Sequence, residues 1–186
     1  MPVDGEYEPS PQEWVRNQVA EYEASGGQRA NTLLDTGLPI IVLTTVGNRS
    51  GKVRKTPLMR VAHEGSYALV ASKGGAPEDP EWFHNLVAHP ESVALQDGPA
   101  PFDVDVRRLE EGEEREQWWE RAVAAYPPYA EYQAATERRI PVFVVTPKGW
   151  SAGVRRADGG RSAAGGRWID RVRGRRRSSL GSGTVG

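Results

Sequence analysis

The sequence predicts an α+β domain built as a small closed or split antiparallel β-barrel that carries added helices. Six short apolar runs, rich in β-branched residues, are separated by turns that contain glycine, proline or aspartate. Helical patterns occur near the N-terminus, after the third run and before the last run. Short strands joined mostly by hairpins leave few exposed edges when they close into a barrel, so this architecture fits the pattern best.

Each predicted strand is delimited by turn residues and by its own apolar pattern. The strands are predicted over residues 39–46, 53–61, 67–71, 92–96, 102–108 and 141–145. Pro57 cannot donate a backbone hydrogen bond, so it places the second strand at an edge or at a bulge. In the fifth strand Phe102, Val104 and Val106 alternate with polar residues, which predicts that these three side chains face the core.

Capping residues mark the starts of the predicted helices. Ser10 and Glu13 form a capping box, so a first helix is predicted to start there and to pack across the barrel or against a subunit partner. Asp79 is predicted to cap a second helix over Glu81–Ala88. A third, amphipathic helix is predicted over residues 110–125, before the last strand.

The 186 residues suit one folded domain, predicted over residues 1–147, with an appended tail over residues 148–186. The tail holds ten cations and two aspartates, a net charge of +8, while the other 14 cations and 23 acids give residues 1–147 a net charge of −9. Glycine and arginine dominate the tail and large apolar residues are few, so it is predicted to be disordered. The acidic body argues against specific nucleic-acid binding, which needs a broad basic face.

The residues that are absent exclude several classes of site. The chain has no cysteine, so it has no disulfide and no thiolate metal site. The spacing of His63, His84 and His89 matches no metal-ligand motif, and no metal is predicted. No apolar run reaches the roughly 20 residues that span a bilayer, and the acidic, polar N-terminus does not resemble a secretory signal. These features predict a soluble cytoplasmic protein.

The loop between the first two strands is the strongest candidate for a binding site. Residues 47–52 read Gly-Asn-Arg-Ser-Gly-Lys. Four cations and a serine gather in this loop and the strand after it, namely Arg49, Ser50, Lys52, Arg54 and Lys55. Glycines let a ligand approach the backbone, and consecutive N–H groups in such a loop can bind an anion. The loop is therefore predicted either as a cradle for phosphate or carboxylate groups or as a solvated, charged turn.

Two further stretches suit contact with an anion or a ring. The residues 72–75, Ser-Lys-Gly-Gly, follow directly after the third strand, where the glycines allow close approach of a ligand. The alternative is an ordinary turn. His84 and Asn85 lie early in a helix, where side chains and free N–H groups can meet a ligand. The alternative for His84 is a surface or capping histidine.

Taken in order, these motifs resemble the deazaflavin (F420)-dependent nitroreductase family, and within it the F420H2-dependent quinone reductases. The similar motifs are Leu43-Thr-Thr-x-Gly47-x-x-Ser50-Gly51-x-x-Arg54-x-Thr56-Pro57-Leu58, Val70-Ala-Ser-x-Gly74-Gly75, Pro80-x-Trp82-x-x-Asn85-Leu86, and Tyr129-x-x-Tyr132-Gln133 followed by Arg139-Ile140-Pro141-Val142. They cover about residues 12–147. The resemblance implies a split β-barrel of the FMN-binding type, with an N-terminal helix, a helix after the third strand and helices before the last. It also implies that reduced coenzyme F420 is bound, often by a homodimer, and that hydride passes to quinones, nitroaromatics or similar conjugated acceptors.

The resemblance further implies roles for individual residues. The phosphate and the polyglutamate tail of the coenzyme are anionic and would be held by the basic hairpin. The implied cofactor-binding residues are Ser50, Gly51, Lys52, Arg54, Lys55, Thr56, Pro57, Leu58, Met59, Arg60, Val61, Ser72, Lys73, Gly74, Gly75, Phe83, His84, Asn85, Leu86, Val87 and Tyr129. The predicted catalytic residues are Tyr126, Tyr129 and Tyr132, whose phenols would lie at the mouth where an acceptor stacks. Packing in the core or at an interface is the alternative role of these tyrosines.

Three functional hypotheses follow, and the F420H2-dependent reductase leads. An FMN-dependent oxidoreductase of the same barrel type would be yellow after purification. A non-catalytic protein that binds a cofactor or nucleic acid would act through the arginine-rich tail, and its binding to DNA or RNA would depend steeply on salt. A quinone acceptor would also suit peripheral contact with the cytoplasmic membrane. A tyrosine, a serine or a bound water could each supply the proton.

Overall fold

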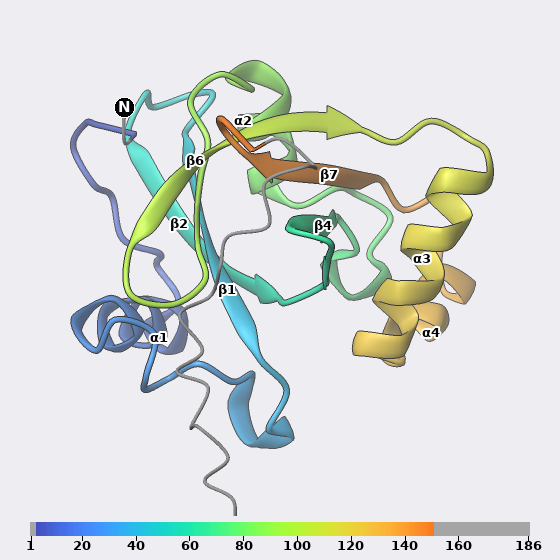
Figure 1. Cartoon of the computed structure of the whole chain (residues 1–186), viewed down its shortest axis with the longest axis horizontal. Coiled ribbons are helices and arrows are strands. Elements are labelled where there is room, and N and C mark those ends of the chain that lie inside the picture. Colours follow the sequence, from blue (N-terminus) through green and yellow to red (C-terminus); the bar gives the residue numbers. More distant parts are fainter. Residues whose placement is uncertain (1–2, 151–186) are drawn as a thin grey trace, which may run out of the picture. The chain divides into compact units, whose positions relative to one another are not determined.

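The computed structural model of the chain describes residues 3–150. Over this range the chain forms a seven-stranded antiparallel sheet decorated by helices (Figure 1). The helices are α1 Glu13–Ala24, α2 Glu81–Ala88, α3 Glu113–Ala125 and α4 Pro128–Ala134, with the 3-10 turns η1 Leu34–Thr36 and η2 Lys73–Gly75. The strands are β1 Ile40–Val46, β2 Val53–Met59, β3 Ala62–His63, β4 Ser66–Val70, β5 Ala94–Gln96, β6 Pro101–Arg108 and β7 Val142–Pro147.

The sheet curls into a split barrel because its two edge strands are neighbours in the chain. The strand order is β2-β1-β5-β6-β7-β4-β3, so β2 and β3 form the opposite edges. Only Arg60 and Val61 separate the end of β2 from the start of β3. Two linking residues hold those ends within about 10 Å of each other, so the edges meet at this corner. This arrangement confirms the predicted α+β split barrel.

Two apolar clusters fill the two faces of the sheet. Ile40 and Val42 of β1 belong to one cluster with residues of α1, α3 and α4, whereas Ile41 and Leu43 belong to the other with residues of α2. Side chains of a strand alternate between faces, so β1 is buried on both. Val104 is buried in the α2 cluster, and Phe102 and Val106 pack against it, as their alternation predicted.

Two predicted helix caps are wrong. The helix α1 begins at Glu13, and Ser10 instead accepts a hydrogen bond through its hydroxyl oxygen from the backbone two residues on, at 3.2 Å. The helix α2 has the predicted bounds, but the carboxylate of Asp79 accepts from the guanidinium of Arg138 at 2.7 Å and does not cap the helix. Serine and aspartate favour caps, yet another donor within reach takes the same oxygen. The helix α3 begins three residues later than predicted.

The start of the predicted tail lies against the barrel. The backbone N–H of Lys148 donates to the carbonyl of Asp103 at 2.9 Å. The indole of Trp150 covers Gly65, where a Cβ atom would lie 2.5 Å from the ring. The rest of the predicted tail, residues 151–186, lies outside the described residues. Within residues 3–150 every helix is too short or too polar to cross a membrane.

Candidate active site

The predicted hairpin is formed by β1 and β2, and its loop is held in one shape. The backbone N–H of Gly47 donates to the carbonyl of Lys52 at 2.8 Å, and the N–H of Gly51 donates to the carbonyl of Gly47 at 2.8 Å. Gly51 has a φ of 69°, a conformation that glycine adopts without strain. A Cβ atom on Gly47 would lie 2.6 Å from the hydroxyl oxygen of Ser50. The backbone conformation of the loop therefore favours glycine at position 51, and the close approach of Ser50 and of the Lys52 carbonyl favours it at position 47, apart from any ligand.

A cavity of about 220 Å³ lies where this loop faces the first turn of α2. Its lining residues are Glu8, Gly47, Asn48, Arg49, Ser50, Arg54, Glu81 and Asn85. Two guanidinium groups and a serine hydroxyl beside a helix N-terminus suit a phosphate or carboxylate group. Two carboxylates, those of Glu8 and Glu81, line the same space and oppose an anion by their charge.

Asn85 joins the hairpin loop to α2. Its side-chain oxygen accepts from the backbone N–H of Asn48 at 3.0 Å, and its amide nitrogen donates to the hydroxyl of Thr45 at 3.3 Å. The side chain is buried. The sequence predicts that Asn85 contacts a ligand; Asn85 lines the cavity, and its hydrogen bonds also set the position of the cradle loop.

The other predicted residues of α2 point in different directions. Leu86 is buried in the core cluster and Phe83 packs half-buried against it, while His84 and Val87 are exposed. Successive residues of a helix are about 100° apart, so five consecutive side chains cannot line one wall. The predicted wall at residues 83–87 therefore divides into a core-facing part and a solvent-facing part.

The cations of β2 do not converge on one point. Adjacent strand residues point to opposite faces of a sheet. Arg54 lines the cavity on the α2 side, whereas Lys55 lies on the α1 side and pairs with Glu23, with 2.5 Å between its ammonium and the carboxylate oxygen. Of the four predicted cations, Arg49 and Arg54 line the cavity.

A short N-terminal segment, residues 4–9, lies along the outer edge of β2 and is called here the acidic arm. Tyr7 forms a parallel bridge with Val53. The backbone N–H of Glu8 donates to the carbonyl of Val53 at 2.9 Å, and the N–H of Val53 donates to the carbonyl of Glu6 at 2.8 Å. Figure 1 shows this dark blue segment beside the start of β2. Sequence reasoning treated these residues as a polar terminus.

Two cations of the predicted cradle are ion-paired with the acidic arm. The ammonium of Lys52 lies 3.1 Å from a carboxylate oxygen of Glu6, and this hydrogen bond raises the pKa of Lys52. Arg54 pairs with Glu8. Both the arm and the hairpin place their charges two residues apart, and this matched spacing is the sequence signal that could have revealed the pairing.

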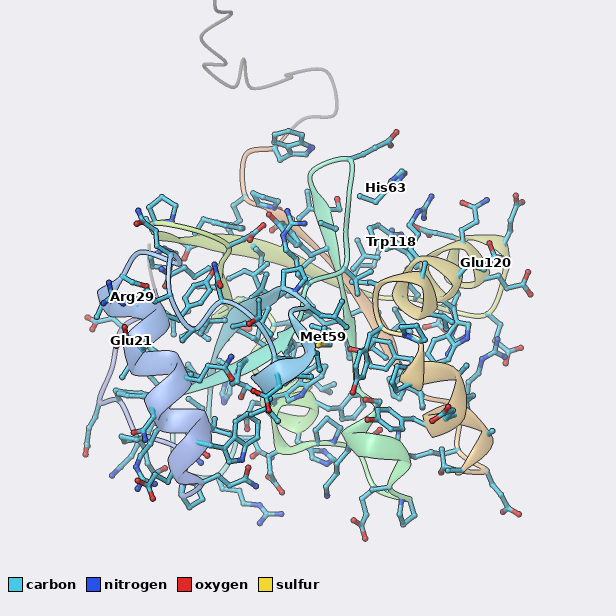
Figure 2. All side chains as sticks on the ribbon, turned by 90° about the horizontal axis from the view of Figure 1, so that it is seen from below. Glu21, Arg29, Met59, His63, Trp118 and Glu120 are labelled. Carbon is cyan, nitrogen blue, oxygen red and sulfur yellow. The ribbon has the colours of Figure 1, made fainter. Side chains whose placement is uncertain are left out.

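The remaining predicted residues of the second strand extend away from the cavity. Thr56, Pro57 and Leu58 are half-buried, while Met59 and Val61 are buried in the core cluster shared with α1 and α4. Figure 2 shows Met59 between α1 and the α3–α4 pair. The distance along the strand from residue 53 to residue 60 is roughly 23 Å, so the predicted residues form an elongated track.

Arg60 marks the far end of that track. Its guanidinium donates to the carboxylate of Asp97 at 2.8 Å, and the hydroxyl of Tyr67 donates to the same oxygen at 2.9 Å. Burial, followed by the charge of Asp97, raises the pKa of Tyr67 to about 12. Arg60 thus forms an ion pair with Asp97 of the same chain.

Arg138 holds the second glycine loop, Ser72 to Gly75, by hydrogen bonds to backbone carbonyls in and beside the loop. This guanidinium donates to the carbonyls of Ala71, Ser72 and Ala76 at 2.8–3.2 Å, besides its bond to Asp79. Sequence reasoning missed Arg138, because its partners lie about 60 residues away and leave no local signal.

The residues of this loop differ in their surroundings. Gly75 packs against α4, where an added Cβ would lie 2.7 Å from the carbonyl oxygen of Tyr132. A Cβ on Gly74 would meet nothing within 4 Å. Lys73 is exposed and pairs with Glu78 at 3.3 Å. Gly74 and Lys73 therefore face open space, and Gly75 serves the contact between η2 and α4.

The three predicted catalytic tyrosines do lie together. Their rings are 5.0–6.3 Å apart, centre to centre, and the hydroxyls of Tyr126 and Tyr132 are hydrogen-bonded at 3.2 Å. Tyr129 is buried, and its hydroxyl bonds to no residue within 3–150. Burial, then the neighbouring phenols, raises the pKa of Tyr129, and the bond to Tyr132, then burial, raises that of Tyr126 to about 12. These two phenols are neutral at physiological pH.

Comparisons with known proteins identify one family. A family model described as F420H(2)-dependent quinone reductase matches residues 14–147. An F420H(2)-dependent quinone reductase of Mycobacterium tuberculosis is 34% identical over 134 residues, which are 71% of this chain and 89% of that relative. The solved structure of an F420-H2-dependent reductase is 57% identical, with a TM-score of 0.53, over 57% of this chain and 93% of the other. Another, described as a domain-swapped dimer, is 52% identical, with a TM-score of 0.55, over 73% and 99% of the two chains.

The family match spans α1 to β7 and so includes the hairpin, the glycine loop and the tyrosines. It also agrees with the resemblance found in the motifs. The chain belongs to the F420H2-dependent quinone reductase family and is an oxidoreductase whose coenzyme is reduced F420.

Proposed function

We propose that this chain holds reduced F420 along β2, with the anionic end of the coenzyme at the hairpin cavity and its ring toward the tyrosines of α4, and reduces a quinone-like acceptor there. One observation carries the proposal: the cavity brings Arg49, Ser50 and Arg54 together beside the first turn of α2. These groups match a phosphate or a carboxylate in charge and in hydrogen bonding.

An elongated coenzyme suits the length of this track. The strand β2 is an edge strand, and in the described chain its outer edge is bridged only at Val53, by the acidic arm. Met59, near the far end of β2, packs in the same core cluster as Tyr129. F420 has a ring at one end and phosphate and glutamates at the other. Arg54 and Met59 face opposite sides of the sheet, so the coenzyme would cross the open outer edge of β2 between its charged end and its ring.

Bound reduced F420 supplies the hydride, and the protein supplies position and polarity. Arg49 and Arg54 would bind the charged end, and the closed hairpin loop would fix its place. The hydroxyl of the neutral Tyr129 bonds to no residue within 3–150 and can donate a hydrogen bond to an acceptor oxygen. The hydroxyls of Tyr126 and Tyr132 are hydrogen-bonded to each other, and the two rings would keep Tyr129 in place by ring contacts.

A fluorescence titration tests coenzyme binding. Addition of the purified chain should quench the fluorescence of F420, and the data should fit a micromolar dissociation constant. Oxidation of F420H2 is then followed with quinone, nitroaromatic and enone acceptors, and the quinones are expected to be the fastest. Binding of FMN in place of F420, with a yellow colour after purification, would overturn the proposal.

A homodimer is the second part of the proposal. Its support is the solved structure 52% identical to this chain that is described as a domain-swapped dimer. Light scattering should give a mass of about twice the 20.4 kDa of one chain. A mass of one chain at the concentrations used for the assay would contradict it.

A further inference from the structure

We propose that the acidic arm competes with the anionic end of the coenzyme for Lys52 and Arg54, so that Glu6 and Glu8 lower the affinity for F420 and make it depend on the coenzyme's tail. This inference rests on the proposed function, because it concerns the same cradle. It assigns a role to two carboxylates that lie outside the helices and strands of the barrel.

The arm already presents to the cradle what the coenzyme would present. Glu6 lies 3.1 Å from the ammonium of Lys52, and Glu8 is paired with Arg54. The two carboxylates of the arm are two residues apart in sequence, and they pair with two cations that are also two residues apart. A polyglutamate tail would offer the same groups to the same cations.

The carboxylate of Glu8 also stands in the space that an anion would enter. It lines the cavity together with Arg49, Ser50 and Arg54. A second anion beside an occupied guanidinium meets repulsion from Glu8 as well as attraction from the arginines. Entry of a phosphate or glutamate group is therefore favoured when Glu8 leaves.

The arm is attached loosely enough to leave. The Lys52–Glu6 and Arg54–Glu8 pairs are solvent-exposed at one or both partners, and such pairs contribute little to stability. Two backbone hydrogen bonds to Val53 hold the arm, and the ammonium of Lys55 lies 4.9 Å from the ring centre of Tyr7. Few buried contacts and exposed hydrogen bonds are the features of segments that open locally.

Neutral variants test the competition without removing the arm. The change Glu6→Gln with Glu8→Gln keeps the side-chain size and the backbone bonds to Val53 while removing both charges. We expect F420 to bind about two- to tenfold more tightly to this variant, as two exposed ion pairs allow. The deazaflavin ring with its ribityl chain alone, which lacks the phosphate and the glutamates, should bind equally to both proteins.

A matched control separates competition from net charge. Glu21 on α1 and Glu120 on α3 lie away from the cradle and are labelled in Figure 2. The double change Glu21→Gln with Glu120→Gln also removes two negative charges, and we expect it to leave F420 affinity unchanged. An equal gain of affinity in this control would overturn the proposal, because it would show a general charge effect.

Hydrogen exchange gives a second readout that does not depend on turnover. Saturating F420 should speed exchange at the backbone amides of Glu8 and Val53, which bond across the arm and β2. Unchanged exchange there, with equal F420 affinity in the wild type and the arm variant, would overturn the inference and leave the proposed function intact. A wild-type chain that binds no F420 would overturn the proposed function itself.

Discussion

The side-chain oxygen of Asn85 on α2 accepts a hydrogen bond from the backbone N–H of Asn48 in the hairpin loop, at 3.0 Å. This bond joins two segments 37 residues apart and sets the width of the cavity between them. The same amide donates to Thr45 at 3.3 Å. The cradle loop is therefore positioned by the helix that faces it, and not by the hairpin alone.

Asn85→Ala is expected to lower the free energy of unfolding by about 1–3 kcal/mol, because it removes the partners of the Asn48 backbone N–H and of the buried Thr45 hydroxyl. Urea denaturation measures this loss. The control is His84→Ala, an exposed position on the same helix, where the change should stay within about 0.5 kcal/mol. Equal effects of the two substitutions would contradict the role given to Asn85. F420 affinity should fall with Asn85→Ala, since the loop loses its anchor.

Arg138→Ala is expected to lower the free energy of unfolding by about 2–4 kcal/mol, because three backbone carbonyls and the carboxylate of Asp79 lose their donor. Arg138→Lys should recover only part of this loss, since an ammonium cannot reproduce the planar guanidinium pattern. The neighbouring Arg139→Ala, which breaks an exposed pair with Glu111, is the control and should cost at most about 1 kcal/mol. A small effect at Arg138 would show that the glycine loop holds its shape unaided.

Gly74 and Gly75 form a matched pair, because both have φ values in the left-handed region, 65° and 82°. Gly74→Ala should cost about 1 kcal/mol, since only backbone strain is added. Gly75→Ala should cost about 2–4 kcal/mol, because its Cβ would also collide with the backbone of α4 at Tyr132. Thermal or urea unfolding of the two variants makes the comparison. A larger loss at Gly74 would reverse the assignment of the two glycines.

Tyr129→Phe is expected to change acceptor turnover while leaving stability within about 0.5 kcal/mol of wild type, because the lost hydroxyl has no partner within residues 3–150. F420 affinity should stay nearly the same. Tyr126→Phe breaks the bond to Tyr132 and should cost about 0.5–1.5 kcal/mol. Turnover and urea unfolding are measured on both. Unaltered turnover in Tyr129→Phe would remove it from the catalytic residues.

The raised pKa values of two tyrosines predict that the protein loses stability at high pH. Tyr67 and Tyr126 have folded-state pKa values raised from 10.0 to about 12, so the folded state keeps these protons when the unfolded chain has lost them. The resulting stability is fully present below about pH 10 and is lost as the pH rises toward about 12. Absorbance of tyrosinate should appear at higher pH in the native protein than in urea. Coincident titrations would contradict the raised pKa values.

Local sequence was sufficient for most elements of the barrel. The turn residues and β-branched runs predicted the hairpin, and the alternation in residues 102–108 predicted which side chains are buried. The two-residue strand β3 carries no pattern, so it was not predicted. Ser10 and Asp79 misled the prediction of helix caps, because each oxygen found another donor nearby or across the fold.

The candidate site was predictable in its parts and not in its arrangement. Arg54 and Lys55 are adjacent in sequence, and the period of two along a strand sends them to opposite faces. The role of Arg138 depends on Asp79, and that of Glu8 on Arg54, contacts over 59 and 46 residues. The spacing of residues within one segment cannot predict pairs that form between distant segments.

Turn chemistry and periodicity act over a few residues, so local sequence was enough to predict a glycine-containing basic hairpin, a glycine loop and a group of tyrosines in one α+β domain. Which charges of the hairpin face the cavity, and which are paired with the acidic arm, depends on contacts between distant segments. Electrostatic pairing depends on distance in space, and folding brings residues 6 and 8 to residues 52 and 54.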